Sequence, residues 1–239
     1  MSTAKELQVT AAGAYEHVLN DLAPVFRREA GIRIRLTVAN AAGIIRHLES
    51  RQPSDVVLTS AAGIAHLVAA GLADASTQAE IGRVGLGIAV GPGLPLPDLG
   101  TAASVRAALL SATCVAFIDP KGGGTSGPFI AKLFEHLGIA RQMSERGVLS
   151  KTGKDVVCAV ASGEATLGLT QASELIGAKG VQFAGYIAPE VQVVSVYSAA
   201  VSSLAKAPDV ARIFIQFLKN PVSTDCFGRA GWDADSTDL

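Results

Sequence analysis

The sequence predicts an α/β protein built from two lobes. Strand-like runs alternate with helical periods, the order expected of a parallel sheet that helices cover on both faces. A proline- and glycine-rich stretch, Gly91–Pro97, separates two such series and marks a loop or boundary. Of the 239 residues, 49% are hydrophobic and 17% are charged. This composition supplies a sizeable core and excludes a disordered chain.

The first series reads as three strand–helix pairs. The strands are expected where apolar residues run together or alternate with polar ones, at Leu7–Thr10, Ile32–Val38 and Val56–Leu58. The helices are expected where apolar residues recur at three and four positions, around Val18–Phe26, around Ile44–Leu48 and over Gly63–Leu72. Gly31 suits the end of the first helix.

The second series follows the strand expected at Val84–Val90. It is expected to contain helices at Val105–Leu110, Pro128–Leu137 and Val156–Ser162, and strands at Cys114–Ile118 and Leu167–Leu169. The β-branched run Val191–Tyr197 is predicted to return the chain to the first lobe, where the helix Pro208–Leu218 closes it. The predicted lobes are 1–84 with 198–239, and 85–197, with hinge strands near 84–90 and 191–197.

Composition and charge exclude several classes of protein. Twenty basic and 21 acidic residues leave a net charge of −1, and only 5% of residues are aromatic, so nucleic-acid binding is not expected. No apolar run approaches the roughly 18 to 20 residues of a membrane span. Three cysteines without paired spacing, and histidines without ligand spacing, predict no disulfide, no metal site and no cofactor. Cys158, within an apolar run, is expected to be buried.

The carboxyl ends of the predicted parallel strands are where a ligand is expected. In the first lobe these ends lead into Ala11–Tyr15, Asn40–Gly43 and Thr59–Gly63. Tyr15 opens the first helix. Either its hydroxyl is presented at the lobe interface, or Tyr15 is an ordinary residue at the start of a helix with no part in binding.

The second lobe holds the strongest local feature, the loop Asp119–Pro128, between a strand and a helix. Its glycines let backbone N–H groups approach an anion, and Thr125 and Ser126 offer hydroxyl donors. No Gly-Lys-Ser/Thr follows the glycines, so the loop is not a nucleotide-binding P-loop. The alternatives are an anion-binding loop and a flexible solvent loop.

A second candidate loop, Ser150–Asp155, carries Lys151 and Lys154 just before the helix expected from Val156. Either the N–H groups of Val156 and Val157 join an anion site, or the segment is a solvated turn capped by Asp155.

Four motifs in this order resemble the molybdate-binding, ModA-like branch of the type 2 periplasmic solute-binding proteins. They are Val9–Ala14, the run Pro53–Ala61, Asp119-Pro120-Lys121 followed by Gly127, and Asp155–Gly168. The resemblance spans nearly the whole chain. It implies two discontinuous lobes joined by two crossing strands, with an anion held in a cleft that a hinge closes.

The ligand residues of that family map onto this sequence only in part. Its first-loop serine falls on Ala14, its second near Asn40 or Ala41, and its third on Ser126. Its backbone N–H donor falls on Val156 and its tyrosine on Gln171. Two or three hydroxyl donors are therefore lost. A carboxylate held by Asn40, Thr125, Ser126 and Gln171 is a better expectation than molybdate, because an unpaired buried oxyanion is costly.

Two functions follow from the resemblance. One is a receptor for a small anion, either an oxyanion or an organic carboxylate. The other is a carboxylate isomerase of the aconitate-isomerase kind, which resembles the same family and moves a proton along a di- or tricarboxylate. For the isomerase, Lys121, Lys151, Arg46 and the glycine loop supply donors, and the candidate proton carriers are Tyr15, Glu16, His17 and Lys151. A neutral donor set favours the receptor, and a titratable group in the site favours the enzyme.

The sequence starts without a charged, then apolar, leader. The expected location is periplasmic if a signal peptide was trimmed and cytoplasmic if this N-terminus is native. An exported receptor would have an ABC-transporter permease as its partner.

Overall fold

The computed structural model describes residues 6–122 and 124–232. The chain forms two units, each of which is described by itself. Unit 1 comprises the chain up to Arg83 and again from Val196, and unit 2 comprises Val84–Ser195. Two strands, β4 (Ala79–Val90) and β9 (Val194–Val201), carry the chain between the units. Among the described residues, unit 1 is therefore formed by two separate stretches of the sequence, and unit 2 by the stretch between them.

Unit 1 contains a four-stranded sheet in the order β2-β1-β3-β9. Its parallel strands are β1 (Glu6–Ala11), β2 (Arg33–Val38) and β3 (Val56–Ser60), and β9 pairs with β3 in the antiparallel sense. The three strands expected in the first series are therefore confirmed.

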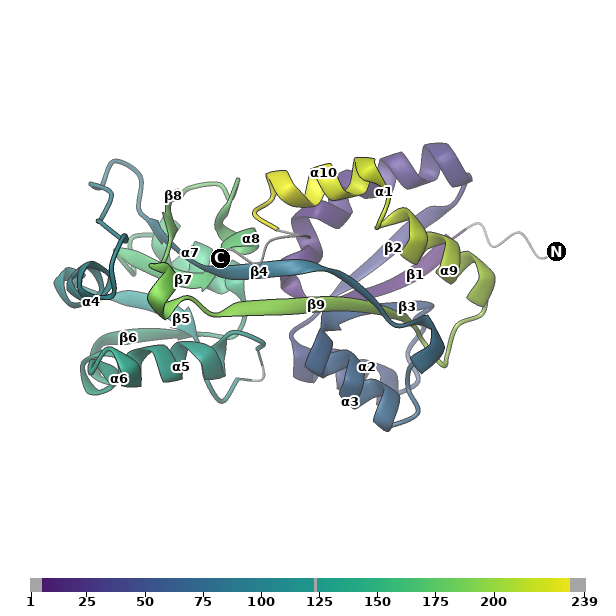
Figure 1. The fold of residues 1–239 in the computed structure, drawn as a ribbon, viewed down its shortest axis with the longest axis horizontal. Helices are drawn as coiled ribbons and strands as arrows, with labels where there is room; N and C mark the ends of the chain where they lie inside the picture. Colours follow the sequence, from purple (N-terminus) through teal and green to yellow (C-terminus); the bar gives the residue numbers. More distant parts are fainter. Residues whose placement is uncertain (1–5, 123, 233–239) are drawn as a thin grey trace. The chain divides into compact units, whose positions relative to one another are not determined.

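Helices cover both faces of this sheet (Figure 1). The helices of unit 1 are α1 (Glu16–Ala30), α2 (Ala41–Glu49), α3 (Ala61–Ala69), α9 (Pro208–Phe217) and α10 (Pro221–Arg229), with short 3₁₀ turns η1 (Gly13–Tyr15) and η2 (Ala75–Thr77). Helices α1, α9 and α10 lie on one face and α2 and α3 on the other. Gly31 ends α1 in the left-handed conformation, at a φ of 72°, as the sequence predicts.

The motif around Asp55 is structural. Its carboxylate, 5% exposed, accepts the N–H of Gln8 through Oδ2 and the N–H of Lys206 through Oδ1, both at 2.8 Å. The neighbouring Ser54 accepts a hydrogen bond from Thr10. The residues preceding β3 therefore fasten β1 to the segment that follows β9.

Unit 2 contains a second sheet, in which β4 pairs with β7 and the order continues β7-β5-β6. Its strands are β5 (Val115–Ile118), β6 (Gly147–Ser150), β7 (Leu167–Gln171) and β8 (Gln182–Tyr186), which pairs with β4. Strands β5, β6 and β7 are parallel.

The helices of unit 2 enclose an apolar core around β5 and β7. They are α4 (Ala102–Ser111), α5 (Gly127–His136), α6 (Ala140–Arg146), α7 (Gly153–Ala161) and the short α8 (Ala172–Leu175), with a 3₁₀ turn η3 (Pro189–Val191). Phe117 of β5 packs edge-on against Phe134 of α5 within that core.

The strand expected at Val191–Tyr197 is present as β9, which returns the chain to unit 1, but it begins three residues later than expected, at Val194. Residues 189–191 turn instead, and the Gln192 amide bonds to the N–H and carbonyl of Leu86. Cys158 is exposed rather than buried. The buried face of α7 is formed by Val156, Ala159 and Val160, and position 158 points away from that face at 100° per residue.

No described helix is both long and apolar enough to cross a membrane.

Candidate functional site

The strand ends of unit 2 bring three loops together. The parallel strands β5, β6 and β7 end at Ile118, Ser150 and Gln171, and helices α5, α7 and α8 follow them. Parallel strands place their carboxyl ends at one edge, and helix N-termini there direct N–H groups outward. We call this the strand-end edge of unit 2.

The glycine loop at this edge is an ordered turn in its described part. Asp119 accepts the N–H of Lys121 through its carboxylate and the N–H of Gly122 through its carbonyl. Gly127 allows close approach, since a β-carbon there would come within 2.6 Å of the Asp119 carbonyl oxygen. Gly123, part of the predicted loop, lies outside the described residues.

The hydroxyl donors expected on this loop differ in exposure. Ser126 immediately precedes α5 and is 3% exposed, yet its hydroxyl makes no capping bond to the helix. Thr125 is half-buried and Lys121 is exposed. The Ser126 hydroxyl therefore lies at the start of α5 but does not cap that helix.

Helix α7 begins three residues earlier than expected, at Gly153 rather than Val156. The N–H of Val156 donates to the carbonyl of Thr152 at 3.2 Å within the first turn of the helix, and its part in ligand binding stays a prediction. Thr152 and Asp155 form a reciprocal capping box. Within the described chain, the N–H groups of Gly153 and Lys154 have no protein acceptor.

The two loops lie against each other. The N–H of Asp119 donates to the carbonyl of Ser150 at 2.9 Å. A β-carbon on Gly124 would lie 3.8 Å from the carbonyl oxygen of Lys151, whose side chain is exposed. The glycine loop and the start of α7 thus form one continuous surface.

Gln171 closes the same edge as the last residue of β7. It is 2% exposed, and its Nε2 donates to the Ser195 hydroxyl at 2.9 Å. Its Oε1 is buried without a hydrogen-bond partner among the described residues. A buried polar atom of this kind calls for an explanation, and a bound donor is one.

Glu174, in α8, was not among the predicted residues. Thr170 donates to its Oε2 at 2.7 Å, and its carboxylate packs on Gly153, where a β-carbon would overlap it. The available signal was an acidic residue in the first turn after a strand. The sequence could not show that this turn meets the start of α7.

The strand-end edge of unit 1 holds the remaining predicted residues. Ala14 is buried in η1, and Ala41 is the first residue of α2. Asn40 Oδ1 caps that helix by accepting the N–H of Gly43 at 2.8 Å. Arg46 is exposed in the last turn of α2. The part of Asn40 in ligand binding stays a prediction.

Among the proposed proton carriers of unit 1, Tyr15 lies in the core. Its ring packs against Tyr197, Phe227 and Trp232, and its hydroxyl donates to the carbonyl of Ser198 at 3.2 Å. Burial, with a smaller contribution from Tyr197, raises the pKa of Tyr15 well above its ordinary value. The hydroxyl is thus not presented to a ligand.

The other two carriers, Glu16 and His17, lie in the first turn of α1. Glu16 is half-buried and His17 is exposed. Within the described residues, no three His, Cys, Asp or Glu side chains gather in a way that could hold a metal ion.

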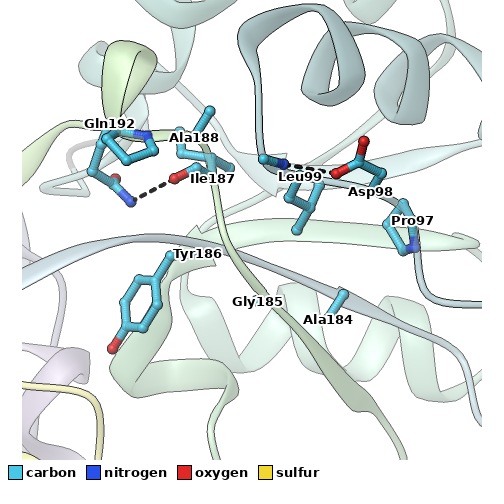
Figure 2. A pocket seen from close by; sticks show the side chains of 11 residues that line it. Pro97, Asp98, Leu99, Ala184, Gly185, Tyr186, Ile187, Ala188 and Gln192 are labelled. Carbon is cyan, nitrogen blue, oxygen red and sulfur yellow. Dashed lines mark hydrogen bonds between the residues drawn. The ribbon is translucent and has the colours of Figure 1, made fainter.

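A cavity of about 380 Å³ lies elsewhere in unit 2 (Figure 2). It is lined by Pro97–Gly100, by the segment Ala184–Pro189 and by Gln192. Two of the polar side chains that Figure 2 shows are engaged in hydrogen bonds: Asp98 accepts the N–H of Gly100, and Gln192 donates to the carbonyl of Ile187. None of the predicted site residues lines it, so the strand-end edge remains the better candidate.

Comparison with known proteins identifies related chains. The family model described as bacterial extracellular solute-binding protein matches residues 7–233. An aconitate isomerase from a Pseudomonas species is 27% identical over 221 residues, which cover 89% of this chain and 81% of the relative.

Two solved structures share the fold. The periplasmic molybdate-binding protein of Azotobacter vinelandii aligns with a TM-score of 0.84 at 19% identity, over 96% of this chain and all of the other. The sulfate-binding protein SubI of Mycobacterium tuberculosis aligns with a TM-score of 0.76 at 16% identity, over 95% of this chain and 86% of the other. The predicted fold and the resemblance to ModA-like proteins are confirmed.

Proposed function

Because the chain belongs to the family of bacterial extracellular solute-binding proteins, we propose that it is a receptor for a small anion. The strand-end edge of unit 2 is the proposed anion site. The observation that carries this proposal is the pair of N–H groups at Gly153 and Lys154, which begin α7 beside the glycine loop without a protein acceptor. A helix N-terminus favours negative charge through its unbonded N–H groups and its dipole.

Further donors of the site lie on the same edge. The Ser126 hydroxyl is not used by its own helix, and Lys121 and Lys151 add positive charge on the two loops. We propose that Ala14, Asn40 and Ala41 of unit 1 also contact the ligand. In the receptor role the ligand would pass to an ABC transporter if the chain is exported.

The proposed ligand class is an organic carboxylate or a related small anion other than molybdate. Ala14 and Gln171 stand where the family resemblance implies hydroxyl donors, so a tetrahedral oxyanion would be left with unpaired oxygens. A carboxylate has fewer oxygens and needs fewer donors.

A direct test is a binding screen of the intact chain by thermal unfolding, confirmed by titration calorimetry. The ligands are molybdate, tungstate, sulfate, phosphate, citrate, and cis- and trans-aconitate. A ligand that binds only the folded state raises the unfolding midpoint as its concentration exceeds its dissociation constant. A shift with molybdate or tungstate alone would contradict the carboxylate class, and no shift with any anion would contradict the receptor itself.

A second candidate is a carboxylate isomerase. Two observations favour it, namely the carboxylate of Glu174 at the proposed site and the aconitate isomerase that is 27% identical. A base and an acid near one allylic carbon are what such a proton shift needs. Incubation with cis-aconitate, followed by proton NMR, would detect the trans isomer, and a Glu174→Gln variant that still binds but no longer converts it would assign the proton to Glu174.

A further inference from the structure

The cavity of unit 2 in Figure 2 has two walls that the fold holds together. One wall is the segment 97–100, which precedes α4, and the other is the segment 184–189. The Glu190 carboxylate joins the ends of these walls by accepting the N–H of Ala102 at the start of α4. The volume, about 380 Å³, lies within the range of pockets that hold small molecules, roughly 300–1,000 Å³.

Close packing also joins the walls, at Gly185 and Leu99. Gly185 has a φ of 139°, which favours glycine, and a β-carbon there would lie 3.7 Å from Leu99 Cδ1. Walls that packing and hydrogen bonds already fix lose little conformational entropy when a ligand binds. The cavity is therefore a preformed site.

The lining is mainly apolar, and its amide group is fully used. Leu99, Ile187 and Pro189 are among the apolar side chains. Gln192 is bonded at both ends: Oε1 accepts the N–H of Leu86, and Nε2 donates to the carbonyls of Leu86 and Ile187. The Gln192 amide thus belongs to the wall and is not available to a ligand.

Asp98 gives the cavity a negative charge. Its Oδ1 accepts the N–H of Gly100 at 2.9 Å, whereas Oδ2 accepts no hydrogen bond from the described residues. Neither Asp98 nor Glu190 forms an ion pair within the described part of the chain. Among the described residues that line the cavity there is no Lys, Arg or His. The cavity is therefore complementary to a positive charge.

We propose that this cavity is a second binding site, for a small organic ammonium ion. The apolar part of the ligand lies between the walls, and its N–H groups donate to Oδ2 of Asp98. A neutral molecule of the same shape makes only the apolar contacts, and one carboxylate supplies too few oxygens to hold a metal ion. None of the proposed anion-binding residues lines the cavity, so this proposal does not depend on the anion receptor.

Two probes of matched shape test the proposal, namely benzylamine, which is protonated at neutral pH, and benzyl alcohol. Titration of the intact ¹⁵N-labelled chain, followed by NMR, gives both the affinity and the place of binding. Asp98 is exposed, so the expected preference for the ammonium is modest, about 3–10-fold. The amide signals of Gly100 and Gly185 should shift while that of Gly153, at the strand-end edge, does not. About 500 mM salt should reduce the preference by screening.

Three variants assign the preference to Asp98 and the binding to the cavity. Asp98→Asn keeps an oxygen for the Gly100 N–H but removes the charge, so both probes should bind with similar affinity. Glu164→Gln is the matched control, because it removes an exposed acidic charge of unit 2 outside the cavity, and it should keep the preference. Ala184→Leu fills the cavity and should weaken both probes.

A third probe, acetyl-lysine methylamide, carries the same charge on a flexible chain that loses more rotamer freedom on binding. It should bind more weakly than benzylamine, and tighter binding would overturn the small-molecule ligand in favour of a protein side chain. Equal binding of benzylamine and benzyl alcohol to the wild type would overturn the ammonium site, as would no binding of either. A preference that survives in Asp98→Asn would overturn the role of this carboxylate.

Discussion

The Tyr15 hydroxyl donates to the carbonyl oxygen of Ser198, a residue 183 positions further along the chain, at 3.2 Å. This bond fastens the turn after β1 to β9, the strand through which the chain re-enters unit 1. It also makes Tyr15 a core residue, since the ring packs among Tyr197, Phe227 and Trp232.

Replacing Tyr15 with phenylalanine is expected to cost about 1 kcal/mol of stability at neutral pH, the net value of one hydrogen bond. Anion affinity should stay unchanged, because the hydroxyl is not presented to a ligand. Chemical denaturation and titration calorimetry measure the two quantities. A variant that keeps its stability but loses binding or turnover would contradict the assignment of Tyr15 to the core.

The same variant carries a pH prediction. Burial raises the pKa of Tyr15 in the folded chain, so the unfolded chain releases this proton first as pH rises. The free energy of unfolding should therefore fall as pH rises above the ordinary tyrosine pKa of about 10. Tyr15→Phe has no hydroxyl to titrate and should not lose stability in this way. The difference in free energy of unfolding between wild type and variant should therefore narrow between about pH 9 and 11. A constant gap would contradict the prediction.

Ser126 is expected to hold the ligand through its hydroxyl. Ser126→Ala should weaken anion binding by about 1–3 kcal/mol, as for a hydrogen bond to a charged group. Stability should change little, since the hydroxyl makes no capping bond to α5. The matched control is Ser162→Ala, at the opposite end of α7, where the hydroxyl donates to the Ala159 carbonyl. Unchanged affinity in a folded Ser126→Ala would remove the glycine loop from the site.

Asn40 caps helix α2, and a second asparagine, Asn220, caps helix α10 in the same way. Asn40 Oδ1 accepts the N–H of Gly43, and Asn220 Oδ1 accepts the N–H of Ser223, each at 2.8 Å. Either alanine variant should lose about 1 kcal/mol of stability with its helix cap.

Only Asn40→Ala should also weaken anion binding, because Asn220 begins α10 and does not follow a strand of the parallel set. Titration of both variants with the same anion measures the difference. Equal affinities would show that Asn40 takes no part in ligand binding.

Cys158 is expected to be the thiol that reacts first in the folded chain. It is exposed, whereas Cys114 and Cys226 are half-buried and the Cys114 thiol contacts the carbonyl of Arg146. A colorimetric disulfide reagent should show one fast phase that Cys158→Ser removes. A fast phase that persists in this variant would contradict the exposure of Cys158.

Local sequence patterns located most elements but not all. Alternating or continuous apolar residues identified β1, β2, β3 and β5. Strand β2 begins with alternating exposed and half-buried positions, and strands β3 and β5 are almost entirely buried. Strand β6 was missed because it is four residues long and its Leu149 is 60% exposed. The start of α7 was misplaced although Thr152 and Asp155 carry the spacing of a capping box, a better indicator than the first valine.

The sequence by itself determined the alternation of strands and helices, and with it the loops at which a ligand is expected. Periodicity reports which residues turn inward, and chain order reports which loops follow strands. Only the tertiary structure decided what those residues meet. It placed the Tyr15 hydroxyl on Ser198 and the Glu174 carboxylate on Gly153. Such contacts join separate segments, whose packing depends on the shapes of both partners and not on the pattern of either one.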